Sequence, residues 1–372
     1  MNILTLCYEF PPLGGGGGKV VQGLSKNIVK LGYQVDIVTM GYKGLSNYEE
    51  HGGANIYRVP CLRASEAICH SHEMASYIAF AIPKLKKLVA NKRYDLNHTH
   101  FIFPDGIIAY LLKKRFGLPY VITAHGSDVP GYNPDRFKMQ HKIIAPLWKT
   151  IVQNSACIIC PSRTIESLIH LQKPDATTSV IPNGMDINRL TPPQEKQKSI
   201  LVVTRMFKRK GVQYCIEALK GFKHGFEVNI VGDGPYLDTL RDMAKTNGLN
   251  IKFWGWLDND SSQLKDLFEK SSIFIFPSEA ENFPIVLLEA MAAGMAIITT
   301  LGTGCSEVVG DSALLVEPRD SNGIRNALSS LVNDPNFCRS LGVSSRKRLE
   351  NNFSWFSVAK RYSDLFQKYI TA

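Results

Sequence analysis

The sequence predicts two consecutive α/β domains, each built on a parallel, doubly wound sheet. Candidate strands and helices alternate from end to end, which is the pattern of parallel strands joined by crossover helices. A Pro- and Lys-rich stretch at 192–198 reads as a linker, and the alternation restarts after it. The length of 372 residues suffices for two domains of ordinary size. We therefore expect two sheets facing a cleft, with ligands beyond the carboxyl ends of the strands.

The first domain, residues 1–182, begins with a buried strand that runs into a glycine-rich loop. The helix after that loop has Val20, Leu24, Ile28 and Leu31 at helical spacing, and Gly32 ends it. An apolar patch at 74–82 stops at Pro83. The expected strands of this domain are Asn2–Leu6, Val35–Val38, Ile56–Val59, Leu96–Thr99, Tyr120–Thr123, Cys157–Cys160 and Ser179–Ile181.

The second domain, residues 183–353, repeats the pattern. Residues 284–293 predict a helix, because Pro is tolerated in a first turn and Gly294 ends the run. A last amphipathic helix covers 354–370, and we expect the segment 354–372 to return to the first domain. The expected strands are Ile200–Val203, Val228–Val231, Ile251–Phe253, Ile273–Phe276, Ala296–Thr299 and Ala313–Val316.

Composition describes a soluble globular protein with a basic first half. Apolar residues make up 44% and charged residues 20% of the chain. No apolar run approaches the roughly 18 residues that span a bilayer. Residues 1–180 carry 20 Lys and Arg against 12 Asp and Glu, a net of +8, whereas the remainder carries 23 against 21, a net of +2. The asymmetry predicts that the first half meets an acidic ligand or surface, with an ordinary basic solvent face as the alternative.

No signal peptide is visible, so we expect a cytoplasmic protein with reduced cysteines. The lone pair Cys157 and Cys160 lacks the further ligands that zinc requires, and no metal site is predicted.

Two carboxylates bracket the start of the helix at 284–293. Glu281 falls in the loop between a buried strand and this helix, and Glu289 lies inside the helix. The free N–H groups of the first helical turn lie between them and suit an anion. This arrangement predicts a site for a sugar, a diphosphate and a ribose in line; the alternative is a capped core helix with two unrelated acids.

A cationic loop follows the first strand of the second domain. Arg205 and Lys210 stand five residues apart in it. A guanidinium grips two phosphate oxygens and an ammonium acts as a point charge, so the loop predicts a diphosphate clamp; an exposed basic loop is the alternative.

Further candidates lie at other predicted strand ends. The glycine run 14–18 lets the backbone approach a phosphate or sugar, but its spacing fits neither a dinucleotide fingerprint nor a P-loop. His125 follows a strand and precedes Gly126. Asn183 begins a turn at the crossover between domains, and Gly232 lies in a Gly-Asp-Gly-Pro loop that forms a wall of the expected nucleotide pocket.

Taken in order, these motifs resemble the retaining glycosyltransferases of the GT-B fold, in the GT4 family (glycosyl transferases group 1). The resemblance spans nearly the whole chain, and its most specific parts are the Arg205–Lys210 and Glu281–Glu289 pairs. The sequence departs from the family pattern at Thr204, Asn282 and Pro284, where a glycine is frequent.

The resemblance implies a role for each candidate. Arg205 and Lys210 stabilise the leaving diphosphate, Glu281 holds the hydroxyls of the donor sugar, and His125 contacts that sugar near the reacting carbon. Glu289 binds the ribose. The remaining substrate-binding candidates are Gly16 and Gly17 over the phosphates or acceptor, Asn282 and Phe283 as backbone donors, Asn183, Gly232, and Trp256 with Leu257 beside the base.

The predicted reaction moves a hexosyl or N-acetylhexosaminyl group from a nucleotide-diphosphate sugar to a hydroxyl of a glycan or lipid-linked acceptor. No cofactor or metal is expected, because fixed cations face the leaving group. We expect peripheral contact with an anionic membrane at its inner face, and no nucleic-acid partner. A sugar-nucleotide epimerase and a non-catalytic glycan-binding protein are the competing hypotheses.

Overall fold

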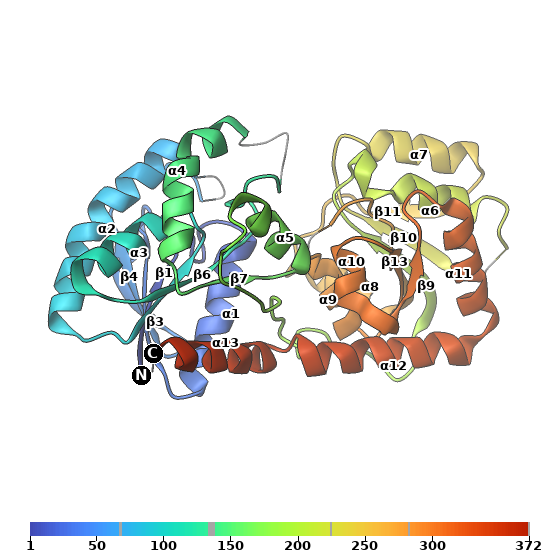
Figure 1. Ribbon diagram of the computed structural model, residues 1–372. Helices are drawn as coiled ribbons and strands as arrows, with labels where there is room; N and C mark the ends of the chain where they lie inside the picture. Colours follow the sequence, from blue (N-terminus) through green and yellow to red (C-terminus); the bar gives the residue numbers. More distant parts are fainter. Residues whose placement is uncertain (67–68, 133–137, 224, 282, 371–372) are drawn as a thin grey trace. The chain divides into compact units, whose positions relative to one another are not determined.

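The computed structural model describes residues 1–66, 69–132, 138–223, 225–281 and 283–370. The chain folds into two compact units (Figure 1). The first comprises Met1–Gly184 and the C-terminal segment from Trp355, and the second is Met185–Ser354.

In its described residues the first unit contains an eight-stranded sheet in the order β3-β4-β2-β1-β5-β6-β7-β8. All neighbouring strands are parallel except β3, which pairs antiparallel with β4 at the edge. The strand order reverses between β1 and β5. The strands are β1 Asn2–Leu6, β2 Gln34–Met40, β3 Tyr48–His51, β4 Ala54–Val59, β5 Leu96–His100, β6 Tyr120–Thr123, β7 Cys157–Cys160 and β8 Thr178–Val180.

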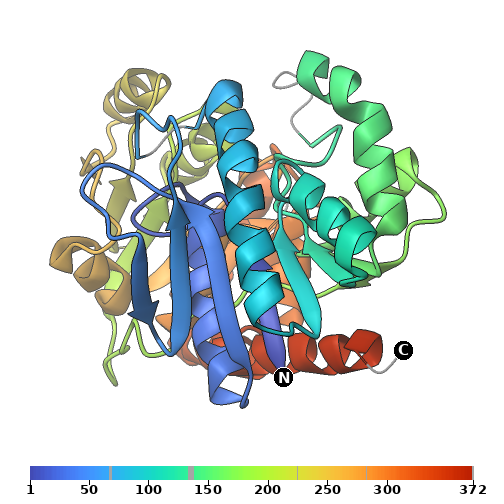
Figure 2. The same ribbon diagram turned by 90° about the vertical axis from the view of Figure 1, so that its left-hand side faces the viewer.

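Helices cover both faces of this sheet. Figure 2 shows α2 in front of the strands and α1 behind them. Consecutive helices cross to opposite faces where the strand order reverses, which is the doubly wound arrangement. The helices are α1 Gly16–Lys30, α2 Ser71–Asn91, α3 Asp105–Phe116, α4 Lys138–Asn154, α5 Arg163–Gln172 and α13 Trp355–Ile370.

The second unit has a six-stranded, all-parallel sheet in the order β11-β10-β9-β12-β13-β14 across its described residues. Numbered within the unit, this order is 3-2-1-4-5-6, that of dinucleotide-binding sheets, and it reverses between β9 and β12. The strands are β9 Gln197–Val203, β10 Glu227–Val231, β11 Ile251–Phe253, β12 Ser271–Phe276, β13 Ala296–Thr300 and β14 Leu314–Val316.

The central strands of this sheet are apolar on both faces because helices cover both. Ile273, Phe274 and Ile275 of β12 are each 0% exposed, so the strand reads as a continuous apolar run. The helices are α6 Val212–Leu219, α7 Leu237–Thr246, α8 Ser262–Lys270, α9 Ile285–Ala292, α10 Gly304–Val309, α11 Ser321–Asn333 and α12 Pro335–Asn352, with short 3₁₀ turns at Lys208–Lys210 and Gly310–Ser312.

The predicted fold class is confirmed, and the differences are local. The antiparallel strand β3 was not predicted, because Tyr48–His51 is polar and mostly exposed and so lacks an apolar pattern. The 192–198 stretch is not a linker throughout, since β9 already begins at Gln197. The helix α2, for which no bounds were predicted, runs through Pro83, the residue at which the apolar patch 74–82 ends. Tyr77, Ala81 and Leu85 of this helix are fully buried, and their packing outweighs the roughly 3 kcal/mol that an interior proline costs.

The C-terminal helix α13 packs against α1 of the first unit. Its Phe366 is fully buried, and its Tyr362 hydroxyl lies 3.1 Å from Thr123 Oγ1 of β6. At its start, the Trp355 indole fills space that a side chain at Gly23 of α1 or at Gly184 would need: a Cβ at either position falls 2.3 Å from a ring atom.

This contact gives a prediction. Gly23→Ala should lower the free energy of unfolding by about 1–3 kcal/mol, because the methyl group overpacks the indole. The measurement is urea denaturation followed by circular dichroism. The double variant Gly23→Ala, Trp355→Leu should lose less than the sum of the two single variants, and strict additivity would contradict the contact.

Candidate active site

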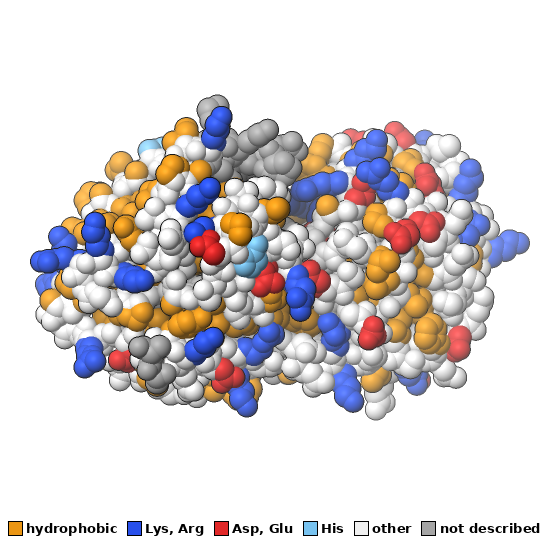
Figure 3. Space-filling model, in the orientation of Figure 1, with side chains coloured by type: hydrophobic (Ala, Val, Ile, Leu, Met, Phe, Trp, Pro, Cys, Tyr) orange, Lys and Arg blue, Asp and Glu red, His pale blue; other side chains and the backbone are white. Residues whose placement is uncertain are grey.

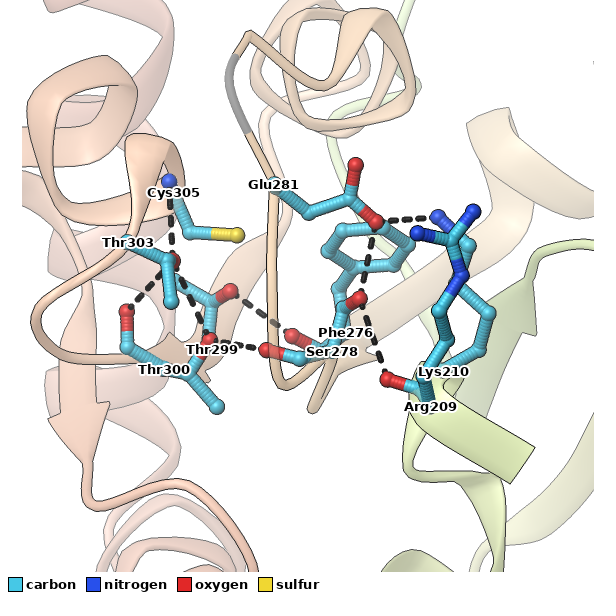
Figure 4. Close-up of polar contacts among 9 residues, drawn as sticks. All are labelled: Arg209, Lys210, Phe276, Ser278, Glu281, Thr299, Thr300, Thr303 and Cys305. Atoms are coloured by element: carbon cyan, nitrogen blue, oxygen red, sulfur yellow. Dashed lines mark hydrogen bonds and ion pairs between the residues drawn. The ribbon is translucent and has the colours of Figure 1, made fainter. Parts of the chain in front are cut away.

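Two loops meet at the carboxyl ends of β9 and β12, where the strand order of the second unit reverses. The Lys210 ammonium pairs with Glu281 Oε1 across the two loops (Figure 4). The hydroxyl of Ser278 donates to the same oxygen at 2.8 Å. The Lys210 and Glu281 side chains are only 10% and 15% exposed, so each charge is stabilised chiefly by the other.

Backbone contacts hold these loops at a fixed separation. The Glu279 N–H donates to the Arg209 carbonyl at 2.9 Å, and from a third segment, at the start of α10 after β13, the Gly304 N–H donates to the Glu281 carbonyl at 2.8 Å. Gly211 has φ +74°, and a Cβ there would lie 1.9 Å from the Pro277 carbonyl oxygen. Only glycine allows the loop after β9 to approach the end of β12 this closely.

The Gly-Asp-Gly-Pro loop after β10 packs against the same cationic loop. Gly232 has φ +131°, and a Cβ there would lie 1.7 Å from the Thr204 carbonyl oxygen. The Met206 N–H donates to the Asp233 carbonyl at 2.9 Å. Gly232 therefore sets the spacing of the loops on which Arg205 is carried.

These loops surround a pocket of about 400 Å³. The Arg205 side chain is exposed, and Trp256 is 63% exposed. Most of the second-unit candidates that the sequence predicted line this pocket: Arg205, Lys210, Gly232, Trp256, Leu257, Glu281 and Glu289. Phe283 instead packs against the core beside the pocket, with its ring 5.9 Å from that of Phe353. The predicted backbone donor Asn282 lies outside the described residues.

Two polar residues of this site were not predicted from the sequence. Arg189 Nη1 lies 3.1 Å from Glu289 Oε1, and its Nη2 donates to the Asn259 carbonyl at 2.6 Å. Ser278, fully buried, holds Glu281. Arg189 is one hundred positions from Glu289 in the sequence, so no local pattern could predict this ion pair. The signal for Ser278 was its place as a small polar residue directly after a strand.

The first unit carries its own cluster at the end of β1, β5 and β6. Gly16 and Gly17 begin α1, and a Cβ at Gly17 would lie 3.6 Å from His125 Nδ1. The His125 Nε2 lies 3.0 Å from His100 Nδ1, and its backbone N–H donates to Asp128 Oδ1 at 2.9 Å. The structure thus brings the glycine run and His125 together. Asn183 lies at the end of this unit, whereas the 400 Å³ pocket belongs entirely to the second.

Burial keeps the histidines of this cluster neutral. It lowers the pKa of His98 and of His125 to about 3, and that of His100 well below its ordinary value. His98 Nε2 lies 2.8 Å from Thr123 Oγ1, which links the cluster to Tyr362 of α13. A neutral His125 offers a hydrogen bond without adding charge.

The described residues contain neither a cluster suited to a metal ion nor a helix suited to crossing a membrane. No group of three or more His, Cys, Asp and Glu side chains is arranged to hold a metal ion there. In the same residues, every helix falls short of the combined length and apolar character that crossing a bilayer requires.

Comparison with known proteins assigns the family. The model "Glycosyltransferase Family 4" matches residues 14–189, and the model "Glycosyl transferases group 1" matches residues 186–348. The chain is a GT4 glycosyltransferase with the GT-B fold. Its relatives include an uncharacterised glycosyltransferase of Methanocaldococcus jannaschii, 27% identical over 99% of this chain and 98% of the relative.

Solved structures agree on the fold. Sucrose-phosphate synthase from Thermosynechococcus elongatus superposes with a TM-score of 0.77 at 21% identity, covering 100% of this chain and 99% of the other. The Anabaena protein HepE, in complex with UDP, superposes with a TM-score of 0.75 at 16% identity, covering 99% and 100%. The glycosyltransferase expected from the motifs is thereby confirmed at the level of family and fold.

The buried histidines predict an acid-sensitive fold. The unfolded pKa of histidine is about 6.5 and the folded values are lower, so the unfolded chain binds more protons below that pH. Stability is therefore fully present above about pH 6.5 and declines as the pH falls towards the folded pKa values. His98→Gln removes one of the groups that take up a proton on unfolding. Between pH 7 and 5 it should therefore reduce the slope of the free energy of unfolding against pH by up to roughly 1.4 kcal/mol per pH unit, the value for one proton.

Urea denaturation at several pH values measures this slope. His72→Gln, on the exposed surface of α2, is the matched control. If both variants have the slope of the wild-type protein, His98 does not carry the acid sensitivity.

Proposed function

We propose that this glycosyltransferase moves a hexosyl or N-acetylhexosaminyl group from a nucleotide-diphosphate sugar to an acceptor hydroxyl, with retention at the anomeric carbon. The observation that carries the proposal is one pocket, at the reversal of strand order, lined by Arg205, Lys210, Glu281 and Glu289. Such reversals are where doubly wound sheets bind nucleotides. The UDP bound to the structurally similar HepE supports the same donor class.

In this proposal the residues that line the pocket serve the three parts of such a donor. Glu289 of α9 binds the ribose hydroxyls, and Trp256 and Leu257 contact the base. Arg205 and Lys210 provide two positive charges for the diphosphate. Glu281 accepts hydrogen bonds from the sugar hydroxyls. The neighbouring Lys210 binds the phosphate to which the sugar is attached.

Charge stabilisation of the leaving group is the main chemical task. The bond between the anomeric carbon and the phosphate oxygen breaks, leaving negative charge on the diphosphate. Fixed cations aimed at that charge lower the barrier without reorganising during the reaction. In this proposal Arg205 and Lys210 do this work, and the reaction needs no metal ion.

Retention is explained best by attack on the same face as the leaving group. The acceptor oxygen bonds to the anomeric carbon as the phosphate oxygen departs, and that phosphate oxygen takes the acceptor proton. A double displacement would instead require Glu281 as nucleophile. The Glu281 oxygen Oε1 already receives both Lys210 and Ser278, which favours a holding role over nucleophilic attack.

The first unit is proposed to serve the acceptor and the reacting sugar. Gly16 and Gly17 leave the backbone open at the start of α1, and a partly exposed, neutral His125 lies beside them. A glycan or lipid-linked acceptor in polysaccharide biosynthesis fits this assignment.

Nucleotide-sugar recognition is tested by thermal shift against UDP-, GDP-, ADP- and TDP-sugars. One donor should raise the melting temperature by mass action, by an amount set by its concentration over its dissociation constant. Glu289→Ala should remove most of that shift because it deletes the ribose contact. The matched control is Glu350→Ala on α12, which does not line this pocket. A shift of wild-type size in Glu289→Ala would refute the ribose role.

Turnover tests the cationic clamp. Arg205→Ala should lower kcat by about 10²–10³-fold, since it removes an electrostatic contact to the leaving group. Steady-state kinetics at saturating donor measures the effect. Arg209→Ala, on the same loop but absent from the pocket lining, is the control. An unchanged kcat in Arg205→Ala would count against the clamp.

Peripheral membrane contact is proposed from the basic surface of the first unit. Lys and Arg side chains lie among hydrophobic ones over this unit (Figure 3). Lys113, Lys114 and Arg115 of α3 are exposed, next to Phe116, which is 42% exposed. Replacing the three cations by Glu should abolish co-sedimentation with anionic vesicles at low salt. Equal binding of the wild-type protein to neutral and anionic vesicles would contradict this contact.

A further inference from the structure

A second, larger pocket of about 750 Å³ lies at the opposite end of the sheet in the second unit. Gln197 and Lys198 at the start of β9, and Ser272 near the start of β12, line it. The candidate active site follows the carboxyl ends of those same two strands. The two pockets share no lining residue and are separated by the length of the strands.

One face of α12 forms the wall of this pocket. Gly342 at its centre lies against the turn between α9 and β13: a Cβ there would be 2.3 Å from the Gly294 carbonyl oxygen. The hydroxyl of Ser345 donates to the Met295 carbonyl at 2.9 Å. These contacts fix the helix on the sheet and make the wall rigid. The α12 residues on this wall include Cys338, Arg339, Val343 and Lys347.

The floor of the pocket is apolar. Leu331 of α11 and Cys338 of α12 are 1% and 8% exposed, and the half-buried Phe226 and Val332 line the pocket with them. Val343 is 63% exposed at its rim. An apolar concavity with an exposed apolar rim is the usual setting for the hydrophobic part of a small ligand.

The charges around this floor are unbalanced. The lining contains Lys196, Lys198, Arg339, Arg346 and Lys347 against Glu350 alone. Two of the cations are already engaged. Lys196 Nζ donates to the carbonyls of Glu269 and Ser271 at 2.9 and 2.8 Å, and Arg346 pairs with Glu350 at 3.0 Å.

The other three cations, Lys198, Arg339 and Lys347, are exposed and have no ion-pair partner among the residues that the structure describes. They surround one concavity, so each raises the electrostatic cost of the others. A multiply charged anion would relieve that repulsion, and a guanidinium gives it a bidentate partner.

We propose that this pocket binds a small organic anion, which presents a phosphate-type group to Arg339, Lys347 and Lys198 and packs an apolar portion against Leu331 and Cys338. This site shares no lining residue with the donor pocket, so a test of anion binding here is separate from a test of the transferase mechanism.

Calorimetric titration of the full chain tests it with three probes: n-octyl phosphate, n-octyl glucoside and inorganic phosphate. The two amphiphiles are kept below their critical micelle concentrations. The alkyl phosphate should bind at one site at least about tenfold more tightly than either other probe. It is the probe that has both a phosphate group for the cations and an alkyl chain for the apolar floor. The exposed double variant Arg339→Glu, Lys347→Glu should weaken it by about tenfold or more. Lys245→Glu on α7, outside the pocket, is the control.

Two results would overturn the proposal: equal affinity for the glucoside, or unchanged affinity in the double variant. Alkylation by N-ethylmaleimide locates the binding independently. The alkyl phosphate should slow modification of Cys338, and the partly exposed Cys61 and Cys69 serve as internal controls in the same digest. Absence of selective protection at Cys338 would also count against the site.

The source of the anion is distinguished by a vesicle arm. If the phosphate belongs to a lipid headgroup, anionic vesicles should compete with n-octyl phosphate in a protein whose Lys113, Lys114 and Arg115 are replaced by Glu, so that the α3 surface does not contribute. In that background, Arg339→Glu and Lys347→Glu should weaken vesicle binding. If it belongs to a free metabolite, only the dissolved probe should bind. Either result supports the pocket. If neither the vesicles nor the dissolved probe binds there, the proposal is contradicted.

Discussion

The candidate active site depends on the ion pair between Lys210 and Glu281, which joins the loops that leave β9 and β12. Both side chains are largely buried, and removing either would leave the other charge in a poorly solvated position. The pair therefore fixes the distance between a cation suited to phosphate and a carboxylate suited to sugar hydroxyls. Ser278, on the same loop as Glu281, fixes the orientation of the carboxylate.

Close backbone packing makes this ion pair geometrically possible. Gly211 and Gly232 each bring one loop to within contact of the carbonyl of another, at positions where a Cβ would overlap that oxygen. Three loops, after β9, β10 and β12, thereby act as one rigid frame. The catalytic proposal needs that rigidity, because cations aimed in advance at the leaving group are worth more than cations that must reorient.

The candidate binding regions of the two units differ in charge: the second unit presents cations, and the first presents neutral histidines. The second unit places cations at both ends of its sheet: Arg205 and the ion-paired Lys210 at the carboxyl ends of β9 and β12, and Arg339 and Lys347 along α12 at the other end. The first unit buries a cluster of neutral histidines beneath its glycine-rich loop, where desolvation keeps their pKa values low. A charged pocket suits a diphosphate, and a neutral histidine suits hydroxyl groups and a sugar ring.

The sequence by itself determined the fold class, nearly every strand, and the charged residues of the second unit that line the pocket: Arg205, Lys210, Glu281 and Glu289. These follow from local patterns: apolar runs, glycines at loop positions and charged residues directly after strands. Strand ends could be read because the carboxyl ends of parallel strands share one edge of a sheet. Only the tertiary structure decided which distant segments come together: Arg189 meets Glu289, Trp355 packs on Gly23, and the α12 face lines one pocket with the first residues of β9. It also decided that α2 continues through Pro83, since buried packing outweighs local propensity. Such contacts depend on which faces meet after folding, and that information is spread over the whole chain.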